Sequence, residues 1–155
     1  MTSPASPSVA HAVTLWLFRL LTIPQAILFV LQPISIGAFL QGSWAAFDLH
    51  SIGGGLLVLP TMATALVGVV LAVLARRPWL AVGSIALGVL TTGQVAMGHA
   101  RLLAVHIPLG VLLVALAIWL AMWPWTPAAR LDRKRFRGSP AARTHTSTSM
   151  GGVDR

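Results

Sequence analysis

The sequence predicts an all-α integral membrane protein, built as an up-down-up-down bundle of four transmembrane helices. Hydrophobic residues make up 56% of its 155 residues and charged residues only 9%, whereas about a quarter of the residues of a soluble domain are charged. The apolar residues also come in blocks, each close to the roughly 20 residues that a bilayer-spanning helix needs. Because the links between the blocks are short, consecutive helices must be antiparallel neighbours. The expected partner of the apolar outer surface of these helices is the lipid bilayer.

The chain divides into a membrane domain and two flanking segments. The four spans are predicted over about residues 15–40, 49–75, 79–98 and 104–123. Together they form one domain, residues 15–125. Residues 1–14 are predicted as a flexible segment, without the positive charge that opens a secretory signal. Residues 126–155 are basic and of low complexity, which indicates a disordered tail.

Particular residues predict how the first two spans begin and bend. Pro24 and Pro33 lie inside the first block and predict a kink in that helix. Asp48 stands immediately before the second block, where an acidic side chain can serve as the N-cap. Pro60 predicts a bend within the second span, because proline has no N–H to donate within a helix.

The net charge of +8 lies mainly beside the apolar blocks. Arg76 and Arg77 follow the second block, and a basic run follows the fourth: Arg130, Arg133, Lys134, Arg135 and Arg137. The opposite side of the predicted bundle holds only Arg101. Since cytoplasmic loops carry an excess of Arg and Lys, both termini are expected in the cytoplasm, and the chain is expected to cross the cell membrane several times. Contact with anionic headgroups accounts for the basic charge, so no nucleic-acid partner is expected.

Two helix starts repeat one another in sequence. Residues 50–58 and residues 106–114 both follow the pattern His-x-x-x-Gly-x-Leu-Leu-Val, where His50 precedes Gly54 and His106 precedes Gly110. A weaker repeat lies upstream of each, as Gln-x-x-x-x-Gly at 32–37 and Gln-x-x-x-Gly at 94–98. This arrangement indicates a helical hairpin that is present twice in the chain.

The repeat places two histidines at matching depth on the second and fourth spans. These spans run in the same direction and are diagonal in the bundle, with axes about 12–14 Å apart if neighbouring axes are 8–10 Å apart. Two inward imidazoles, each about 2 Å from one metal ion, suit that gap. We therefore predict that His50 and His106 are the axial ligands of a haem iron, with haem b as the cofactor.

Further residues are predicted to complete the haem site. Gly54 and Gly110 lie one turn below the histidines and would leave room for a flat macrocycle. Arg101 is placed to pair with the haem propionates at the outer end of the bundle. His99 is expected to point elsewhere. His11 and His145 lie in polar flanks and are given no role.

Each of these signals also has a structural interpretation. The two histidines can be interfacial residues at helix starts, where an amphipathic ring is tolerated. Glycine and threonine stripes are ordinary packing surfaces between membrane helices. Gln32 and Gln94 can form interhelical hydrogen bonds, and Arg101 can be only a loop cation. The matched depth of the two histidines above small residues is what favours a cofactor.

These motifs resemble one half of the haem A synthase family. The resemblance rests on Gln-x-x-x-(x)-Gly in one helix and on Leu-His-x-x-x-Gly, residues 49–54, at the head of the next. It covers about residues 15–123, and the chain is similar also to small, uncharacterised bacterial four-helix membrane proteins. The resemblance implies a four-helix bundle in which His50 and His106 ligate haem.

The chain departs from that family in three respects. It has four predicted helices where the family has eight, and it has no cysteine pair. The family carries a glutamate near a histidine for its oxidation chemistry, but no acidic residue occurs inside the apolar blocks of this chain. The resemblance therefore supports the bundle and the haem, and it argues against haem A synthesis.

The leading functional hypothesis is a b-type, bis-histidine membrane module that passes single electrons to a redox partner near the extracytoplasmic face. The alternative is a non-catalytic accessory or assembly subunit that works with other membrane subunits. A small transporter is a third hypothesis, although transporters normally carry ionisable groups at the membrane midplane. The sequence shows no Ser-His-Asp set, paired carboxylates or phosphate loop, so a hydrolase or transferase has no support.

Overall fold

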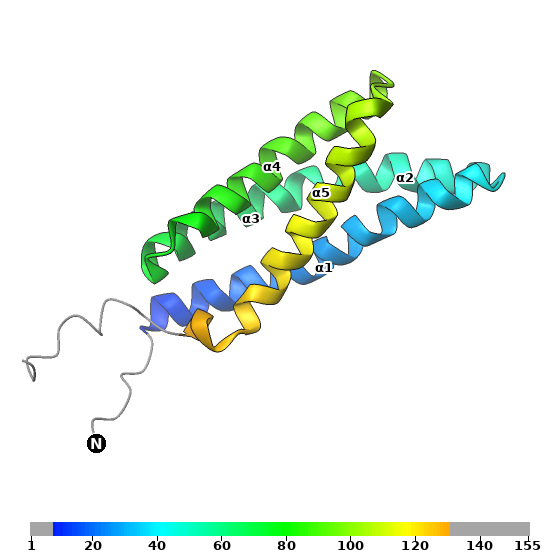
Figure 1. The fold of residues 1–155 in the computed structure, drawn as a ribbon. Coiled ribbons are helices and arrows are strands. Elements are labelled where there is room, and N and C mark those ends of the chain that lie inside the picture. The colour runs from blue at the N-terminus through cyan, green and yellow to red at the C-terminus, as the bar shows by residue number, and fades with distance from the viewer. Residues whose placement is uncertain (1–7, 131–155) are drawn as a thin grey trace, which may run out of the picture.

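The computed structural model describes residues 8–130, and its α-helices account for most of that range. The helices are α1 (Val9–Leu40), α2 (Trp44–Leu56), α3 (Val58–Ala75), α4 (Pro78–His99) and α5 (Leu103–Met122), followed by the short 3₁₀ turns η1 (Trp123–Trp125) and η2 (Pro127–Arg130). Helices α2 and α3 form one span, so four segments are long and apolar enough to cross a membrane. The predicted all-α membrane fold is confirmed (Figure 1).

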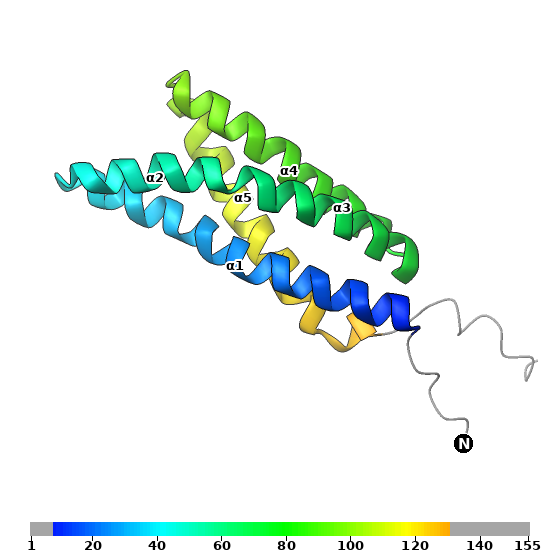
Figure 2. The same ribbon diagram turned by 180° about the vertical axis from the view of Figure 1, so that it is seen from behind.

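The four spans form a closed ring of neighbours. α1 packs against α2 and α3, α3 packs against α4, α4 packs against α5, and α5 packs back against α1. Figures 1 and 2 show the same arrangement from opposite sides, with α5 running from the end of α4 towards the start of α1. The second and fourth spans are therefore the diagonal pair, as an up-down-up-down bundle requires.

The N-terminal boundary of the first helix differs from the prediction. α1 begins at Val9, where Ser8 is the N-cap and its Oγ accepts a hydrogen bond of 3.2 Å from the backbone N–H of His11. Residues 9–14, which were expected to be flexible, are thus helical. The helix also runs through Pro24 and Pro33 without a break.

The second span begins earlier than its apolar block. Gly42 adopts a positive φ of 101° in the turn after α1, and α2 starts directly afterwards at Trp44. Asp48 therefore lies inside α2, and the predicted N-cap role for it is wrong. The bend predicted from Pro60 is present as the break between α2 and α3 at Leu57, because Pro60 cannot donate a hydrogen bond to the preceding turn.

The two 3₁₀ turns η1 and η2 fold back beneath the bundle. The Pro124 carbonyl accepts hydrogen bonds from Arg19, and the Ala128 carbonyl accepts one of 3.2 Å from Arg77. The fully buried His11 bonds the Ala129 carbonyl through Nε2 at 2.9 Å. The view that His11 lies in a polar flank without a role is wrong, since it anchors this segment. Residues 127–130, expected in the disordered tail, form η2; residues 131–155 and His145 lie outside the described residues.

The buried core occupies one half of the bundle. We call residues 8–29, 58–91 and 113–130 the basic half, and residues 30–57 and 92–112 the histidine half. Most of the buried side chains belong to the basic half, including Phe18, Leu71, Leu80, Leu87, Leu113 and Leu120. In the histidine half, the only buried residues are Ala46, which is 6% exposed, and Leu57, which is 2% exposed. One end of the bundle is therefore closely packed and the other is loosely packed.

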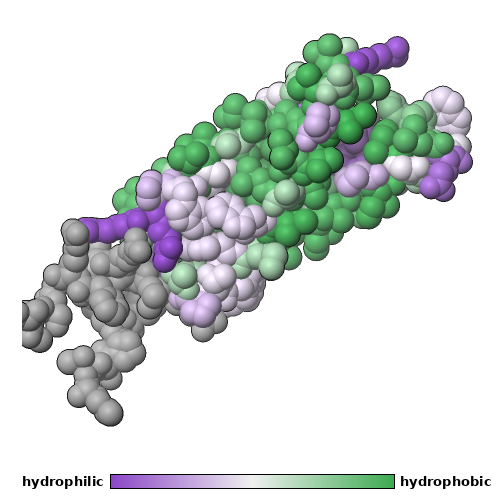
Figure 3. Space-filling view, viewed as in Figure 1, coloured by the Kyte–Doolittle hydropathy of each residue, from purple (hydrophilic) through white to green (hydrophobic). Residues whose placement is uncertain are grey.

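Small and apolar residues of α3 and α5 line the interior of the basic half. Thr61, Thr64 and Gly68 are buried on α3, and Leu113, Ala117 and Ala121 are buried on α5. Large hydrophobic side chains cover the outer surface instead, as a lipid-facing surface requires. On the face shown in Figure 3, the strongly hydrophilic residues gather near the two ends of the bundle.

Candidate functional site: two facing histidines

His50 of α2 and His106 of α5 face one another across the histidine half. Their ring centroids are 6.2 Å apart and the ring planes make an angle of 73°. Both side chains are half-buried. The two helices that carry them belong to the diagonal spans, so the pair is brought together by the topology that the sequence predicts.

Each ring is held by the helix that precedes its own in the chain. Nδ1 of His50 lies 3.1 Å from the carbonyl oxygen of Gln32 on α1, and Nδ1 of His106 lies 3.0 Å from the carbonyl oxygen of Gln94 on α4. A carbonyl oxygen can only accept, so Nδ1 must donate in both bonds. The remaining nitrogen, Nε2, then carries a lone pair in the neutral ring. Metal-bound histidines are usually oriented in this way, with the second nitrogen donating to a carbonyl or carboxylate.

The separation of the ring centres is close to the one that a metal ion bound by both Nε2 atoms would require. With about 2 Å for each metal–nitrogen bond and about 1 Å from each nitrogen to its ring centre, two axial imidazoles have centroids roughly 6 Å apart. The observed separation is 6.2 Å. Within residues 8–130 no group of three or more His, Cys, Asp or Glu side chains could hold a metal ion. Any metal at this pair must take its other ligands from elsewhere.

The glutamine side chains occupy the space that the glycines leave. A Cβ added to Gly110 would lie 2.9 Å from Nε2 of Gln94, and one added to Gly53 would lie 2.6 Å from Nε2 of Gln32. A Cβ at Gly54 would lie 3.6 Å from Oε1 of Gln32. In this structure the glycines therefore accommodate the glutamine amides. The predicted contact of Gly54 and Gly110 with a macrocycle remains a prediction.

Gln94 and His106 are linked in both directions. Besides receiving the imidazole N–H at its carbonyl, Gln94 donates from its amide Nε2 to the carbonyl oxygen of His106. Its amide Oε1 is buried and has no hydrogen-bond partner among the described residues. The double link ties the start of α5 to the end of α4 and so fixes the position of His106.

Gly98 allows the His106 ring to lie close against α4. A Cβ at this position would be 3.0 Å from Cε1 and 3.4 Å from Nδ1 of His106. Gly98 entered the prediction only as the last residue of the Gln-x-x-x-Gly repeat at 94–98, without a role of its own. The carbonyl groups of the two glutamines were missed as well, because only the side chains were considered. Gly98 and the two glutamine carbonyls all lie in the Gln-to-Gly repeat upstream of each histidine. That repeat was the sequence signal that could have identified them.

The other predicted residues lie at the same end but are not brought into the pair. Arg101 is exposed in the turn between α4 and α5, with a positive φ of 57°. His99 is exposed and its Nδ1 bonds the Val95 carbonyl of its own helix, so the expectation that it points elsewhere is confirmed. Asp48 is exposed on α2.

Comparison with known proteins identifies no related protein. Scans of protein-family models, of curated proteins and of solved structures found no match to the chain. The geometry of the histidine pair and its surroundings is therefore the basis for a functional proposal.

Proposed function

We propose that this chain is a b-type, bis-histidine haem protein of the membrane that transfers single electrons. The observation that carries the proposal is the pair of facing imidazoles, His50 and His106, whose Nδ1 atoms both donate to backbone carbonyls and whose centroids are 6.2 Å apart. When bound, haem would supply the one-electron chemistry of its iron.

The number of donors favours haem over a bare metal ion. A structural zinc site takes four protein ligands, whereas a haem iron already has four porphyrin nitrogens and needs only two axial ligands. Two histidines from facing helices are a sufficient set for haem. This is also how cofactor sites in helix bundles are commonly built.

The packing of the bundle supports the same ligand. Helix bundles normally fill their interior with apolar side chains at close to crystalline density. The basic half does so, but in the histidine half only Ala46 and Leu57 are buried. A flat, apolar macrocycle between the α1–α2 and α4–α5 hairpins would provide the missing apolar contacts at that end.

The distribution of charge supports a site near the extracytoplasmic surface. The basic half ends in Arg76 and Arg77, with Arg19 nearby in α1, while the histidine half carries Arg101 and Asp48 among its described residues. The excess of positive charge favours the basic half on the cytoplasmic side. We therefore propose cytoplasmic termini, with Arg101 available to the propionates at the outer end and the redox partner on that side.

An optical spectrum tests the proposal. The full chain is purified from cells supplied with haem, and a reduced-minus-oxidised difference spectrum is recorded. We expect a b-type α-band, which His50→Ala and His106→Ala each abolish. His99→Ala is the matched control, since its ring is exposed at the same end and bonds only its own helix, and it should keep the band. A well-folded but colourless protein would refute the proposal and favour an accessory or assembly subunit.

A further inference from the structure

The helix that carries His50 is held by few contacts. Ala46 is the only buried residue of α2, and α2 packs closely only against α1 and against α3, the helix that continues it. Among residues 8–130, one hydrogen bond joins α1 to α2, from His50 to the Gln32 carbonyl. Figures 1 and 2 show that the α1–α2 hairpin and the α4–α5 hairpin diverge towards their tips. Such a weakly packed element is expected to open locally at low cost.

Both chain segments of the α1–α2 hairpin have a weak point at the level of His50. In the second span, three consecutive glycines (53–55) precede the break at Leu57, and Pro60 cannot donate a hydrogen bond to the preceding turn. Glycine stabilises a helix less than any other residue except proline. In α1, Pro33 lies at the same level and weakens the helix in the same way. We call residues 33–56 the outer arm, and we expect it to bend at this level as one unit.

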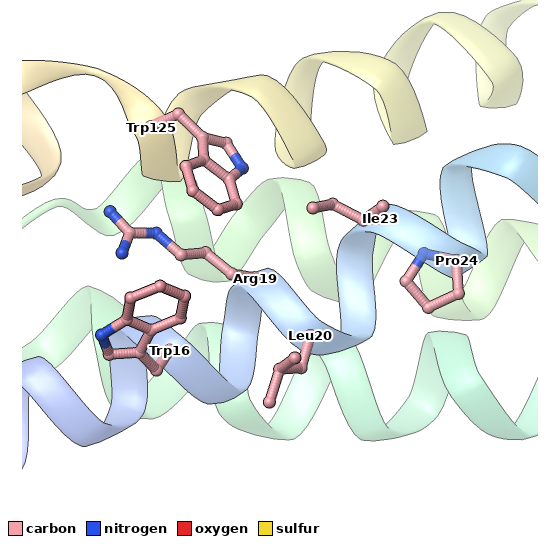
Figure 4. Close-up of a pocket in the computed structure, with 6 residues that line it drawn as sticks. All are labelled: Trp16, Arg19, Leu20, Ile23, Pro24 and Trp125. Carbon is pink, nitrogen blue, oxygen red and sulfur yellow. The ribbon is translucent and has the colours of Figure 1, made fainter.

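The helix that carries His106 is anchored at both of its ends. At its start, Gln94 exchanges two hydrogen bonds with His106. Beyond its end, the Pro124 carbonyl accepts hydrogen bonds of 3.2 Å and 2.6 Å from Nε and Nη2 of Arg19. The same guanidinium packs on the ring of Trp125, with Cζ 4.5 Å from the centroid (Figure 4). Because α5 also packs against α1 and α4, His106 has a fixed position and His50 does not.

We propose that His50 is a displaceable ligand of the haem iron and His106 the fixed one, so that a neutral diatomic molecule such as carbon monoxide binds ferrous haem in place of His50. This inference rests on the proposed haem function. The exchange breaks the bond between iron and Nε2 of His50 and forms one bond from iron to the incoming molecule. No electron or proton is transferred, and Nε2 keeps its lone pair as the outer arm bends away. A neutral ligand suits this apolar half of the bundle, because it brings no charge that must be desolvated.

Distance measurements on the haem-free protein test the hinge. The chain has no cysteine of its own, so spin labels are attached to Leu49→Cys with Val82→Cys, and in a second variant to Ile107→Cys with Val82→Cys. Leu49 and Ile107 each adjoin a histidine, and the three positions are 66%, 62% and 67% exposed in the order 49, 107 and 82. Double electron–electron resonance should give a broader distance distribution for the pair that includes Leu49. Equal widths would overturn the proposal, whether or not the chain binds haem.

Carbon monoxide tests the ligand exchange in the haem-loaded, reduced protein. Gly55→Ala should raise the apparent Kd for carbon monoxide about fivefold, because alanine favours the helix over glycine by about that factor and lowers the fraction of molecules with an open arm. Gly37→Ala is the matched control and should bind like the unaltered protein, since the added Cβ meets nothing within 4 Å at either position. Equal affinities in the two variants would overturn the proposal.

The same spectra separate this inference from the haem proposal. An α-band that carbon monoxide leaves unchanged would overturn the displacement of His50 and leave the bis-histidine haem standing. A folded protein without any α-band would refute the haem proposal itself, and the displacement of His50 with it.

Discussion

Replacing Gly98 with alanine tests whether the close packing of His106 against α4 sets the geometry of the site. The new Cβ would lie 3.0 Å from Cε1 and 3.4 Å from Nδ1 of the ring, so the ring must move by a few tenths of an ångström. The 3.0 Å bond from Nδ1 to the Gln94 carbonyl would lengthen or tilt as a result. Disturbing such a supporting contact typically costs about 10–100-fold in metal affinity. We expect Gly98→Ala to weaken haem binding by that factor.

The assay is a titration of haem into the haem-free protein in detergent, followed by its Soret absorbance. Gly93→Ala is the matched control on the same helix, because its Cβ would meet only Met97, at 3.8 Å, which is ordinary contact. Both changes gain the same helix propensity. Gly93→Ala should therefore bind haem like the unaltered protein. Equal affinities in the two variants would show that the packing of His106 on α4 does not control the site.

Three further predictions concern the bundle and its orientation. Gly68→Ala should lower the unfolding free energy by about 1–3 kcal/mol through overpacking, because the new Cβ would clash with Ser84. An unchanged midpoint of thermal unfolding would contradict this. Thr64→Val removes the 2.7 Å hydrogen bond to Oε1 of Gln25 and should cost about 0.6 kcal/mol, measured in the same way. A single cysteine that replaces Gln41 should react with an impermeant maleimide in intact cells, and a single cysteine that replaces Arg76 should not. The reverse result would invert the proposed topology.

The four spans were predictable because length and composition determine them. A block of about 20 apolar residues in a chain with 9% charge has few alternatives to a membrane helix. Short links then fix the order of neighbours, and the repeat at residues 50–58 and 106–114 fixes the depth of the two histidines. The facing of His50 and His106 follows from these constraints, and the structure places them as the sequence predicted.

The segment beneath the bundle could not be predicted from residue types. Arg19, Arg77 and His11 hold it through the backbone carbonyls of Pro124, Ala128 and Ala129, and carbonyls are present at every position in a chain. The sequence therefore shows the donors but not their acceptors. A histidine in a polar, proline-containing N-terminal stretch gave no sign that it would be fully buried.

The roles of the glycines were also beyond sequence reasoning. The spacing identified Gly54 and Gly110 as positions that would leave room for a flat macrocycle, but it did not show that glutamine amides approach them. The structure places Gln32 and Gln94 amides there, and it gives the ring contact to Gly98 instead. Which neighbour approaches a glycine depends on the rotation of two helices by a fraction of a turn, and the apolar pattern does not resolve that angle.

Electron paramagnetic resonance of the oxidised, haem-loaded protein tests most directly whether two imidazoles bind one iron. A bis-imidazole ferric haem is low-spin, and ring planes at 73° should give a strongly anisotropic signal with one large g value. His106→Ala should convert or abolish it. A high-spin signal from the unaltered protein would mean that only one histidine, or neither, reaches the iron, and the proposed site would be wrong.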